Sequence, residues 1–206
     1  MRLLVATRSR GKQAEFRRLL APLEAEIVFP DDVGLDEQPE EDALEEFDTF
    51  EENARAKAAY FARLSGLASL ADDSGLEVDA LGGGPGVRSK RFAGHDGPDH
   101  QVTAANNAEL LRRLEGVPPF ERTARYRCVL VLSPPPSGGP PRELVVSGTT
   151  EGLILEAPSG DRGFGYDPLF WSADLGIPFG VASAEEKGRV SHRGRAVEAL
   201  IRELSR

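Results

Sequence analysis

The chain contains 206 residues, 40% of them apolar, and carries a formal net charge of −9 at pH 7. Its length and apolar content suit one globular domain with a full core, while the negative charge disfavours a nucleic-acid polymer as partner, because duplex-binding proteins normally present a positive face. No apolar run reaches the roughly 18–20 residues that span a bilayer, and the first residues lack the profile of a signal peptide, so we expect no membrane partner.

The first predicted elements are a strand and a helix joined by a short polar loop. Residues 1–6 form an apolar run typical of a buried strand, and a helix with apolar positions at 14, 16, 19, 20 and 23 follows. In the loop between them, the hydroxyls of Thr7 and Ser9, the ammonium of Lys12 and the free N–H groups of the helix start could hold a phosphate group. The loop is not a Walker loop, because it lacks the second glycine. An ordinary helix cap with exposed cations is the alternative.

An acidic segment follows the second predicted strand, residues 25–29. Between Arg18 and Arg55 the chain has 14 Asp and Glu residues and no Lys or Arg, so the rest of the chain is mildly basic. We interpret most of these acids as a solvated face, with one of them available to a metal.

Thr49 and Glu52 have the spacing of a capping box at the start of a helix that buries Phe50 and further apolar residues. Lys57 lies seven residues after Phe50, on nearly the same helix face. Its side chain therefore either extends along the edge of the core or points into a cleft.

Residues 67–94 combine an apolar run, two carboxylates, glycines and cations. The run ends at Asp72-Asp73-Ser74-Gly75, which predicts a buried strand that stops at a site and turns tightly at Ser74 and Gly75. Adjacent side chains of an extended chain point to opposite sides, so only one carboxylate can face a given pocket and the other should bond locally to backbone or a hydroxyl. The glycine-rich residues 82–86 and the cations at 88, 90 and 91 then suggest a hydrated metal beside a phosphorylated ligand. A plain turn and hairpin is the alternative.

Two strands are predicted in the third quarter of the chain. A helix over 99–114, capped by Asp99, precedes a strand over 123–133, and a Pro/Gly-rich turn joins that strand to another over 142–150. The first of these strands contains Cys128, which is the only cysteine. One cysteine allows no internal disulfide, which fits a cytoplasmic protein.

The last part of the chain, after residue 151, carries an aromatic loop and two helix starts. A strand begins this part and leads into a glycine-punctuated loop with Phe164, Tyr166 and Asp167, whose rings need cover from a flat ligand or from the core. Ser183 and Glu186 have capping-box spacing, and Ser191 is expected to cap a terminal helix. The first turn of that helix holds two residues that either lie at the surface or bind an electron-rich ligand, His192 and Arg193.

Five segments together resemble the inosine triphosphate pyrophosphatase family, also known as dITP/XTP pyrophosphatases. They are VATRSRGKQAEF (5–16), TFEENARAKA (49–58), LADDSGLEVDALGGGPGV (70–87), GFGYDPLF (163–170) and EEKGRVSHRG (185–194). Each is modest alone, but their order and spacing are specific, and the resemblance runs from Leu3 to Leu204.

The resemblance implies an α/β fold with an elongated mixed central sheet flanked by helices. Residues 1–206 would form a single domain of two lobes, with the active-site cleft between the lobes, and the protein would be a homodimer. The implied activity is the Mg²⁺-dependent hydrolysis of ITP, dITP or XTP to the monophosphate and pyrophosphate, which cleanses the nucleotide pool.

The resemblance also implies the site residues. Asp73 would be the proton acceptor, with Asp72 as the less favoured carboxylate and Lys57 close to the phosphates, and the metal ligands would be Asp73 and Glu45. His192 and Arg193 would donate to the 6-keto oxygen of the base, where adenine presents a donor. The substrate-binding residues would be Thr7, Arg8, Ser9, Arg10, Gly11, Lys12, Ser74, Phe164, Gly165, Tyr166, Asp167, Lys187, His192 and Arg193.

The sequence departs from the family pattern at three positions. Ser9 and Gly188 stand where the family usually has Asn, and Arg88 stands where Tyr is common. None of these changes touches Asp73, so they bear on affinity and base preference. Two other functions remain alternatives: a pyrophosphatase for modified pyrimidine triphosphates, and a nucleotide-sensing module without turnover.

Overall fold

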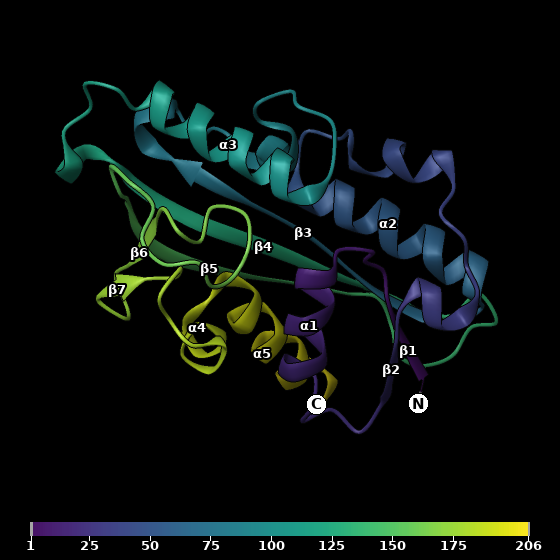
Figure 1. Cartoon of the computed structure of the whole chain (residues 1–206). Coiled ribbons are helices and arrows are strands. Elements are labelled where there is room, and N and C mark those ends of the chain that lie inside the picture. Colours follow the sequence, from purple (N-terminus) through teal and green to yellow (C-terminus); the bar gives the residue numbers. More distant parts are fainter. Residues whose placement is uncertain (1, 206) are drawn as a thin grey trace. The chain divides into compact units, whose positions relative to one another are not determined.

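The computed structural model describes residues 2–205 and contains an open, mixed sheet with the strand order β2-β1-β3-β4-β5-β6-β7 (Figure 1). β1 (Arg2–Val5) pairs in parallel with β2 (Glu26–Val28) and with β3 (Ala68–Val78). β4 (Thr123–Ser133) follows, and β5 (Leu144–Ile154) pairs antiparallel with β6 (Phe170–Ser172), which pairs antiparallel with β7 (Ile177–Pro178). The predicted α/β class with a mixed sheet is confirmed.

Five α-helices accompany the described strands: α1 (Arg10–Leu19), α2 (Phe50–Ser65), α3 (Asp99–Arg113), α4 (Ala184–Val190) and α5 (His192–Leu204). Three of them begin at the hydroxyl caps that the residue types favour, because the side chains of Ser9, Thr49 and Ser183 each accept a backbone N–H of the first turn. Asp99 is the first helical residue of α3 and not its cap. Among residues 2–205, no helix combines the length and the apolar character needed to cross a bilayer.

The described chain forms two compact units, each with its own apolar core. The first unit contains residues 2–73, 128–148 and 193–205, and the second contains residues 74–127 and 149–192. In the first unit, α1 and α5 lie on one side of the strands and α2 on the other (Figure 1), and the core includes Phe16, Leu70 and Leu200. The core of the second unit includes Leu76 and Phe179.

β3 does not stop at Asp72, as the sequence pattern had predicted. It continues through Ser74 and Gly75 to Val78, so these two residues are part of the strand and form no turn. The strand tolerates two buried carboxylates because side chains from helices α1, α2 and α5 satisfy them, as described below. Those partners are distant in sequence, so the local pattern of polar residues could not indicate them.

β5 is also longer than predicted. The strands expected at 142–150 and from 152 onward are one strand, which passes through Gly152. A Cβ atom at Gly152 would lie 2.1 Å from the carbonyl oxygen of Trp171 in β6, so glycine is required here by the close approach of the neighbouring strand.

Candidate active site

Asp72 is the centre of a buried ion-pair cluster in the first unit. Its Oδ2 atom lies 3.0 Å from the Lys12 ammonium and 3.0 Å from a guanidinium nitrogen of Arg193, and Asp72 and Arg193 are each 1% exposed. Arg193 also pairs with Glu15 of α1. Burial alone would raise the pKa of Asp72, but the charges of Lys12, Arg193 and Lys57 outweigh it and hold that pKa well below its ordinary range. Asp72 is therefore an ionised carboxylate that holds two cations in place.

Asp73 has a different environment, on the side of β3 that α2 covers. Its Oδ2 atom accepts a hydrogen bond of 2.8 Å from the Asn53 side chain of α2. Burial raises the pKa of Asp73, and so does the charge of Glu45, and together these effects outweigh the neighbouring lysines. Two adjacent carboxylates thus have pKa values shifted in opposite directions. The predicted separation of their side chains is confirmed, but Asp72 is held by distant cations and not by local backbone.

Lys57 of α2 is buried close to the carboxylates of Glu45, Asp72 and Asp73. Its ammonium donates to Glu45 and to the backbone oxygen of Asp72, the latter at 3.2 Å. Burial lowers the pKa of Lys57, but the charges of Glu45, Asp72 and Asp73 outweigh burial, so the pKa lies above its ordinary value. Lys57 therefore remains charged. Its side chain is buried and does not extend along an exposed edge of the core, and its direction into a cleft stays a prediction.

The loop of residues 7–12 sits at the start of α1, as predicted. Ser9 is in extended conformation and its hydroxyl accepts from the backbone N–H of Lys12, and the Thr7 hydroxyl accepts from the backbone N–H of Ser9 at 3.3 Å. The ammonium of Lys12 points to Asp72. Gly11 lies in the first turn of the helix and Arg10 is exposed. Their contacts with substrate remain predictions.

Arg8 turns towards the acidic segment and not towards Asp72. Its guanidinium Nε and Nη2 atoms each donate to the Glu41 carboxylate at 2.7 Å, and Nη1 lies 2.9 Å from Asp31. The hydrogen bond to Glu41 is the main reason that the pKa of Arg8 is raised. In this structure Arg8 thus holds the acidic segment in place, and its role as a substrate ligand stays a prediction.

The second unit contains the predicted aromatic loop. Asp167 accepts a hydrogen bond of 2.6 Å from Lys187 and one of 2.8 Å from the backbone N–H of Phe164. The Lys187 ammonium lies 4.9 Å from the centre of the Phe164 ring, which is 36% exposed. Tyr166 is buried, and its hydroxyl donates to the backbone oxygen of Ser89 at 2.8 Å. This loop therefore presents one ring beside a buried pair of opposite charges.

His192 is buried in the second unit, where its ring stacks on Tyr126 with the centres 4.7 Å apart. Arg193, the next residue, belongs to the first unit and directs its guanidinium to Asp72 and Glu15. The expectation that both residues donate to the base stays a prediction. Ser74, which follows Asp73 in β3, is half-buried, and its substrate contact is likewise a prediction.

Several residues of these clusters were not predicted as site residues from the sequence. Glu15 and Asn53 are buried partners of Arg193 and Asp73, and Asn107 donates to the backbone oxygen of Gly165 at 3.2 Å. A usable signal existed for the asparagines, because Asn is a poor helix former and an Asn within a helix pattern indicates a side chain with a specific partner. Glu15 gave no such signal.

The carboxylates of Glu45 and Asp73 are the predicted metal ligands. Among the described residues, no group of three or more His, Cys, Asp or Glu side chains is placed to hold a metal ion. The two carboxylates are close enough for the charge of Glu45 to raise the pKa of Asp73, and the Lys57 ammonium donates to Glu45 beside them. Hard oxygen ligands of this kind suit Mg²⁺, which keeps several waters or phosphate oxygens.

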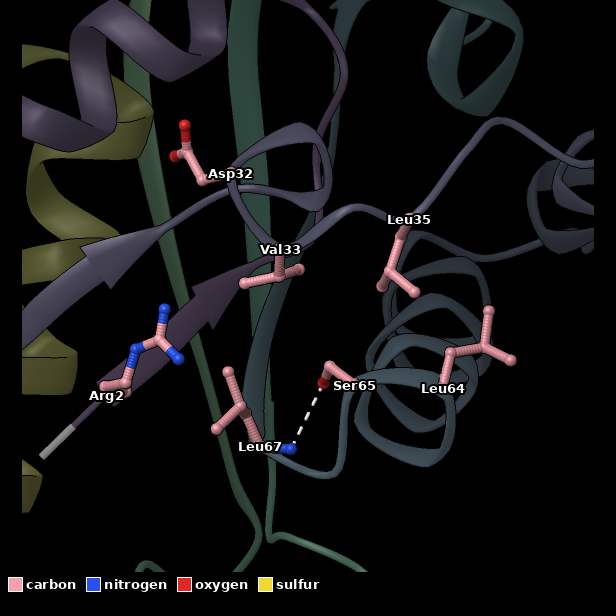
Figure 2. A pocket seen from close by; sticks show the side chains of 7 residues that line it. All are labelled: Arg2, Asp32, Val33, Leu35, Leu64, Ser65 and Leu67. Carbon is pink, nitrogen blue, oxygen red and sulfur yellow. Dashed lines mark hydrogen bonds between the residues drawn. The ribbon is translucent and has the colours of Figure 1, made fainter.

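The first unit also contains a pocket of about 450 Å³, which is lined by other residues (Figure 2). Its walls include Val33, Leu35 and Leu64, and none of the predicted site residues lines it. Its polar groups already have partners, since the Ser65 hydroxyl accepts from the Leu67 backbone at 3.1 Å and Arg2 pairs with Glu26. The pocket therefore is not the candidate active site.

The comparisons with known proteins agree with this arrangement of motifs. The family model of the Ham1 family matches residues 3–203. A dITP/XTP pyrophosphatase of Syntrophobacter fumaroxidans is 48% identical over 202 residues, which cover 98% of this chain and 81% of that protein, and one of Geobacter sulfurreducens is 46% identical over 199 residues, which cover 97% and 94%. The structure of a HAM1 protein from Coxiella burnetii superposes with a TM-score of 0.83 at 34% identity, covering 100% of this chain and 98% of that one. With matches of this identity over nearly its whole length, the chain belongs to the Ham1 family.

Proposed function

We propose that the chain is a nucleoside triphosphate pyrophosphohydrolase that converts dITP, ITP or XTP and water to the monophosphate and pyrophosphate. The observation that carries this proposal is Asp73, a buried carboxylate with a raised pKa beside Lys57 and Glu45. The relatives named dITP/XTP pyrophosphatase support the substrate class.

In the proposed reaction a water attacks the α-phosphorus, the bond from that phosphorus to the bridging oxygen breaks, and pyrophosphate leaves. Asp73 accepts the proton of the attacking water. Burial raises the pKa of Asp73 while the pKa of Asp72 is lowered, so Asp73 is the better proton acceptor of the two carboxylates. Asn53 fixes the orientation of the carboxylate through its hydrogen bond.

Asp72 is not suited to accept that proton, because its pKa is held well below the ordinary range. Its proposed role is to hold Lys12 and Arg193 in place, so that Lys12 faces the phosphate oxygens. A triphosphate carries about four negative charges, and catalysis of phosphoryl transfer depends mainly on positioning and charge stabilisation. We therefore propose Lys12 and Lys57 as the phosphate-binding cations, while His192 and Arg193 keep their proposed role as donors to the base.

We further propose that Mg²⁺ is held by Glu45 and Asp73 together with substrate oxygens. When bound, the ion supplies charge neutralisation at the phosphate groups and a lower pKa for a bound water. The residues of the 7–12 loop complete the phosphate site in this proposal, through the hydroxyls of Thr7 and Ser9 and the start of α1.

Selectivity for the base is proposed to come from the second unit together with Arg193. Hypoxanthine and xanthine present an oxygen acceptor at position 6 and an N–H donor at position 1, whereas adenine presents the reverse pattern. The Lys187 ammonium and the Asp167 carboxylate offer a matching donor and acceptor beside the Phe164 ring. Each buried mismatch costs roughly 1–3 kcal/mol, so two mismatches give about 10²–10⁴-fold discrimination against ATP.

The test is pyrophosphate release from a panel of nucleotides with Mg²⁺. The proposal expects dITP, ITP and XTP to be hydrolysed at least about 100-fold more efficiently than ATP. Faster turnover of dTTP or UTP would support the pyrimidine alternative instead. Tight nucleotide binding without any turnover would support a sensing module.

Two further features complete the proposal. We propose a homodimer, which sedimentation of the purified chain tests directly through its mass. We also propose a cytoplasmic location, for which the single cysteine is the supporting observation.

A further inference from the structure

The aromatic loop of the second unit, residues 163–167, is attached at two points outside itself. The hydroxyl of Tyr166 donates to the backbone oxygen of Ser89 at 2.8 Å, and the backbone oxygen of Gly165 accepts from the Asn107 side chain of α3 at 3.2 Å. Both bonds are made by residues that follow Phe164 closely in sequence, and the ring of Phe164 is 36% exposed. The position of the ring therefore depends on groups that belong to neither the loop nor Lys187.

Asn106, the neighbour of Asn107 in α3, binds the segment of residues 89–93, which includes the partner of Tyr166. Its amide donates to the backbone oxygens of Lys90 and Ser89 at 2.9 and 3.3 Å, and its oxygen accepts from the backbone N–H of Ala93 at 2.8 Å. The side chain of Asn106 is 6% exposed, so three backbone groups of the 89–93 segment are satisfied by one buried amide.

Ser89 connects the two loops to β3. Its hydroxyl accepts from the backbone N–H of Leu76 at 2.8 Å and donates to the oxygen of Gly86, while its backbone oxygen receives both Tyr166 and Asn106. Leu76 is the third residue after Asp73 in the same strand. Ser89, Asn106 and the Tyr166 hydroxyl each have hydrogen-bond partners here, and buried polar groups that are satisfied in this way favour one arrangement.

We propose that Asn107 and the Tyr166 hydroxyl are positioning residues that hold the 163–167 loop where it can distinguish 6-keto from 6-amino purines. This inference rests on the proposed function, and it adds residues that do not themselves donate to the base. The Lys187–Asp167 pair supplies the chemical discrimination, and the two outer bonds determine where that pair and the Phe164 ring lie.

The variants Tyr166→Phe and Asn107→Leu each remove one outer bond and keep the size of the side chain. The measurement is the ratio of kcat/KM for dITP to kcat/KM for dATP, with Mg²⁺, in one preparation of each variant. Because both substrates are tested on the same enzyme, any inactive fraction cancels from the ratio. We expect each variant to lower the ratio about ten-fold, the effect of one buried hydrogen bond, with most of the change in KM for dITP and less than about three-fold in kcat.

The matched control is Arg112→Gln on the same helix, which removes an exposed pair with Glu109 and contacts neither loop. Its ratio should stay within about two-fold of the parent chain. If both loop variants lower only the melting temperature and leave the ratio unchanged, the outer bonds have a merely structural role and the inference is overturned. If the unchanged chain releases no pyrophosphate from dITP, XTP or ITP, the proposed function itself fails.

Discussion

At the scale of single residues, the two adjacent aspartates of β3 show how environment assigns different chemistry to one residue type. Asp72 contacts two cations and remains ionised, while Asp73 is buried beside Glu45 and has a raised pKa. Because side chains alternate along the strand, neighbouring residues meet unrelated partners. Pairs of carboxylates whose pKa values are pushed apart commonly divide acid and base roles in enzymes.

The variant Asp73→Asn tests the proton-acceptor role. We expect kcat for dITP to fall at least about 100-fold, because the amide cannot accept the proton of the attacking water. The melting temperature should not fall, since the raised pKa means that the charged carboxylate is disfavoured where it lies and Asn53 can still donate to the amide oxygen. Steady-state kinetics and a thermal melt provide both results, and near-normal turnover would contradict the role.

Asp72→Asn should behave differently, because it removes the counter-charge of Lys12 and Arg193. Breaking a buried ion pair from one side costs about 3–5 kcal/mol, which corresponds to a fall of roughly 6–20 °C in melting temperature for a chain of this length. Glu198→Gln is the matched control, since it breaks an exposed carboxylate–arginine pair in α5 and should shift stability by less than about 1 kcal/mol. Equal stability of the two variants would show that Asp72 does not hold the cluster together.

At the scale of elements, β4 places Cys128 in the core of the first unit. Burial raises the pKa of its thiol, and the charge of Asp72 adds to that effect. A thiol with a raised folded-state pKa favours the native state below its unfolded pKa of about 8.5 and loses that contribution as the pH rises further.

Alkylation of Cys128 by iodoacetamide should therefore be much slower in the native protein than in urea at every pH between 7 and 9. In urea the rate should rise about ten-fold per pH unit up to about pH 8.5, because the thiolate is the reactive form. Native labelling as fast as labelling in urea would show that the thiol is accessible. Mass spectrometry of the single cysteine measures both rates.

The loop before the aromatic segment depends on a glycine that cannot be replaced. Gly160 has φ +78°, and a Cβ atom there would lie 2.0 Å from the backbone oxygen of Gly180. Gly138 has a similar φ of +80° with nothing within 4 Å. Both alanine variants should lose roughly 1–2 kcal/mol from backbone strain, and Gly160→Ala should lose at least about 2 kcal/mol more from the clash. Equal melting temperatures for the two variants would contradict the close approach.

The elements also show which features a sequence can predict. β4 was predicted with its observed bounds because its apolar run is long, and the Ser183–Glu186 capping box was predicted because both partners lie within one turn. The end of β3 was predicted wrongly, since the partners of Asp72 are as far away as residue 193. A pattern of polar residues indicates a turn only when no distant group satisfies them.

At the scale of the whole molecule, the motifs are divided between two compact units. The loop of residues 7–12, Lys57 and Asp73 belong to the first unit, and the Phe164–Asp167 loop and Lys187 belong to the second. Each unit has its own core, so each group of site residues has its own rigid support.

The candidate site was predictable from sequence mainly through five motifs. Their combination in one order carried the prediction, and no single residue was sufficient. The motifs contain Asp73, Lys57 and Lys187, which the structure places in charged, buried surroundings. They did not indicate that Arg8 would bind Glu41 or that Arg193 would lie between Asp72 and Glu15, because side-chain direction depends on packing between distant elements.

The most direct test of the account is the hydrolysis of dITP in ¹⁸O-labelled water, with the products separated and weighed by mass spectrometry. Attack at the α-phosphorus predicts dIMP that carries one ¹⁸O atom and pyrophosphate without label, formed at least about 100-fold more slowly by Asp73→Asn. Release of dIDP and inorganic phosphate, or label in the pyrophosphate, would contradict the account.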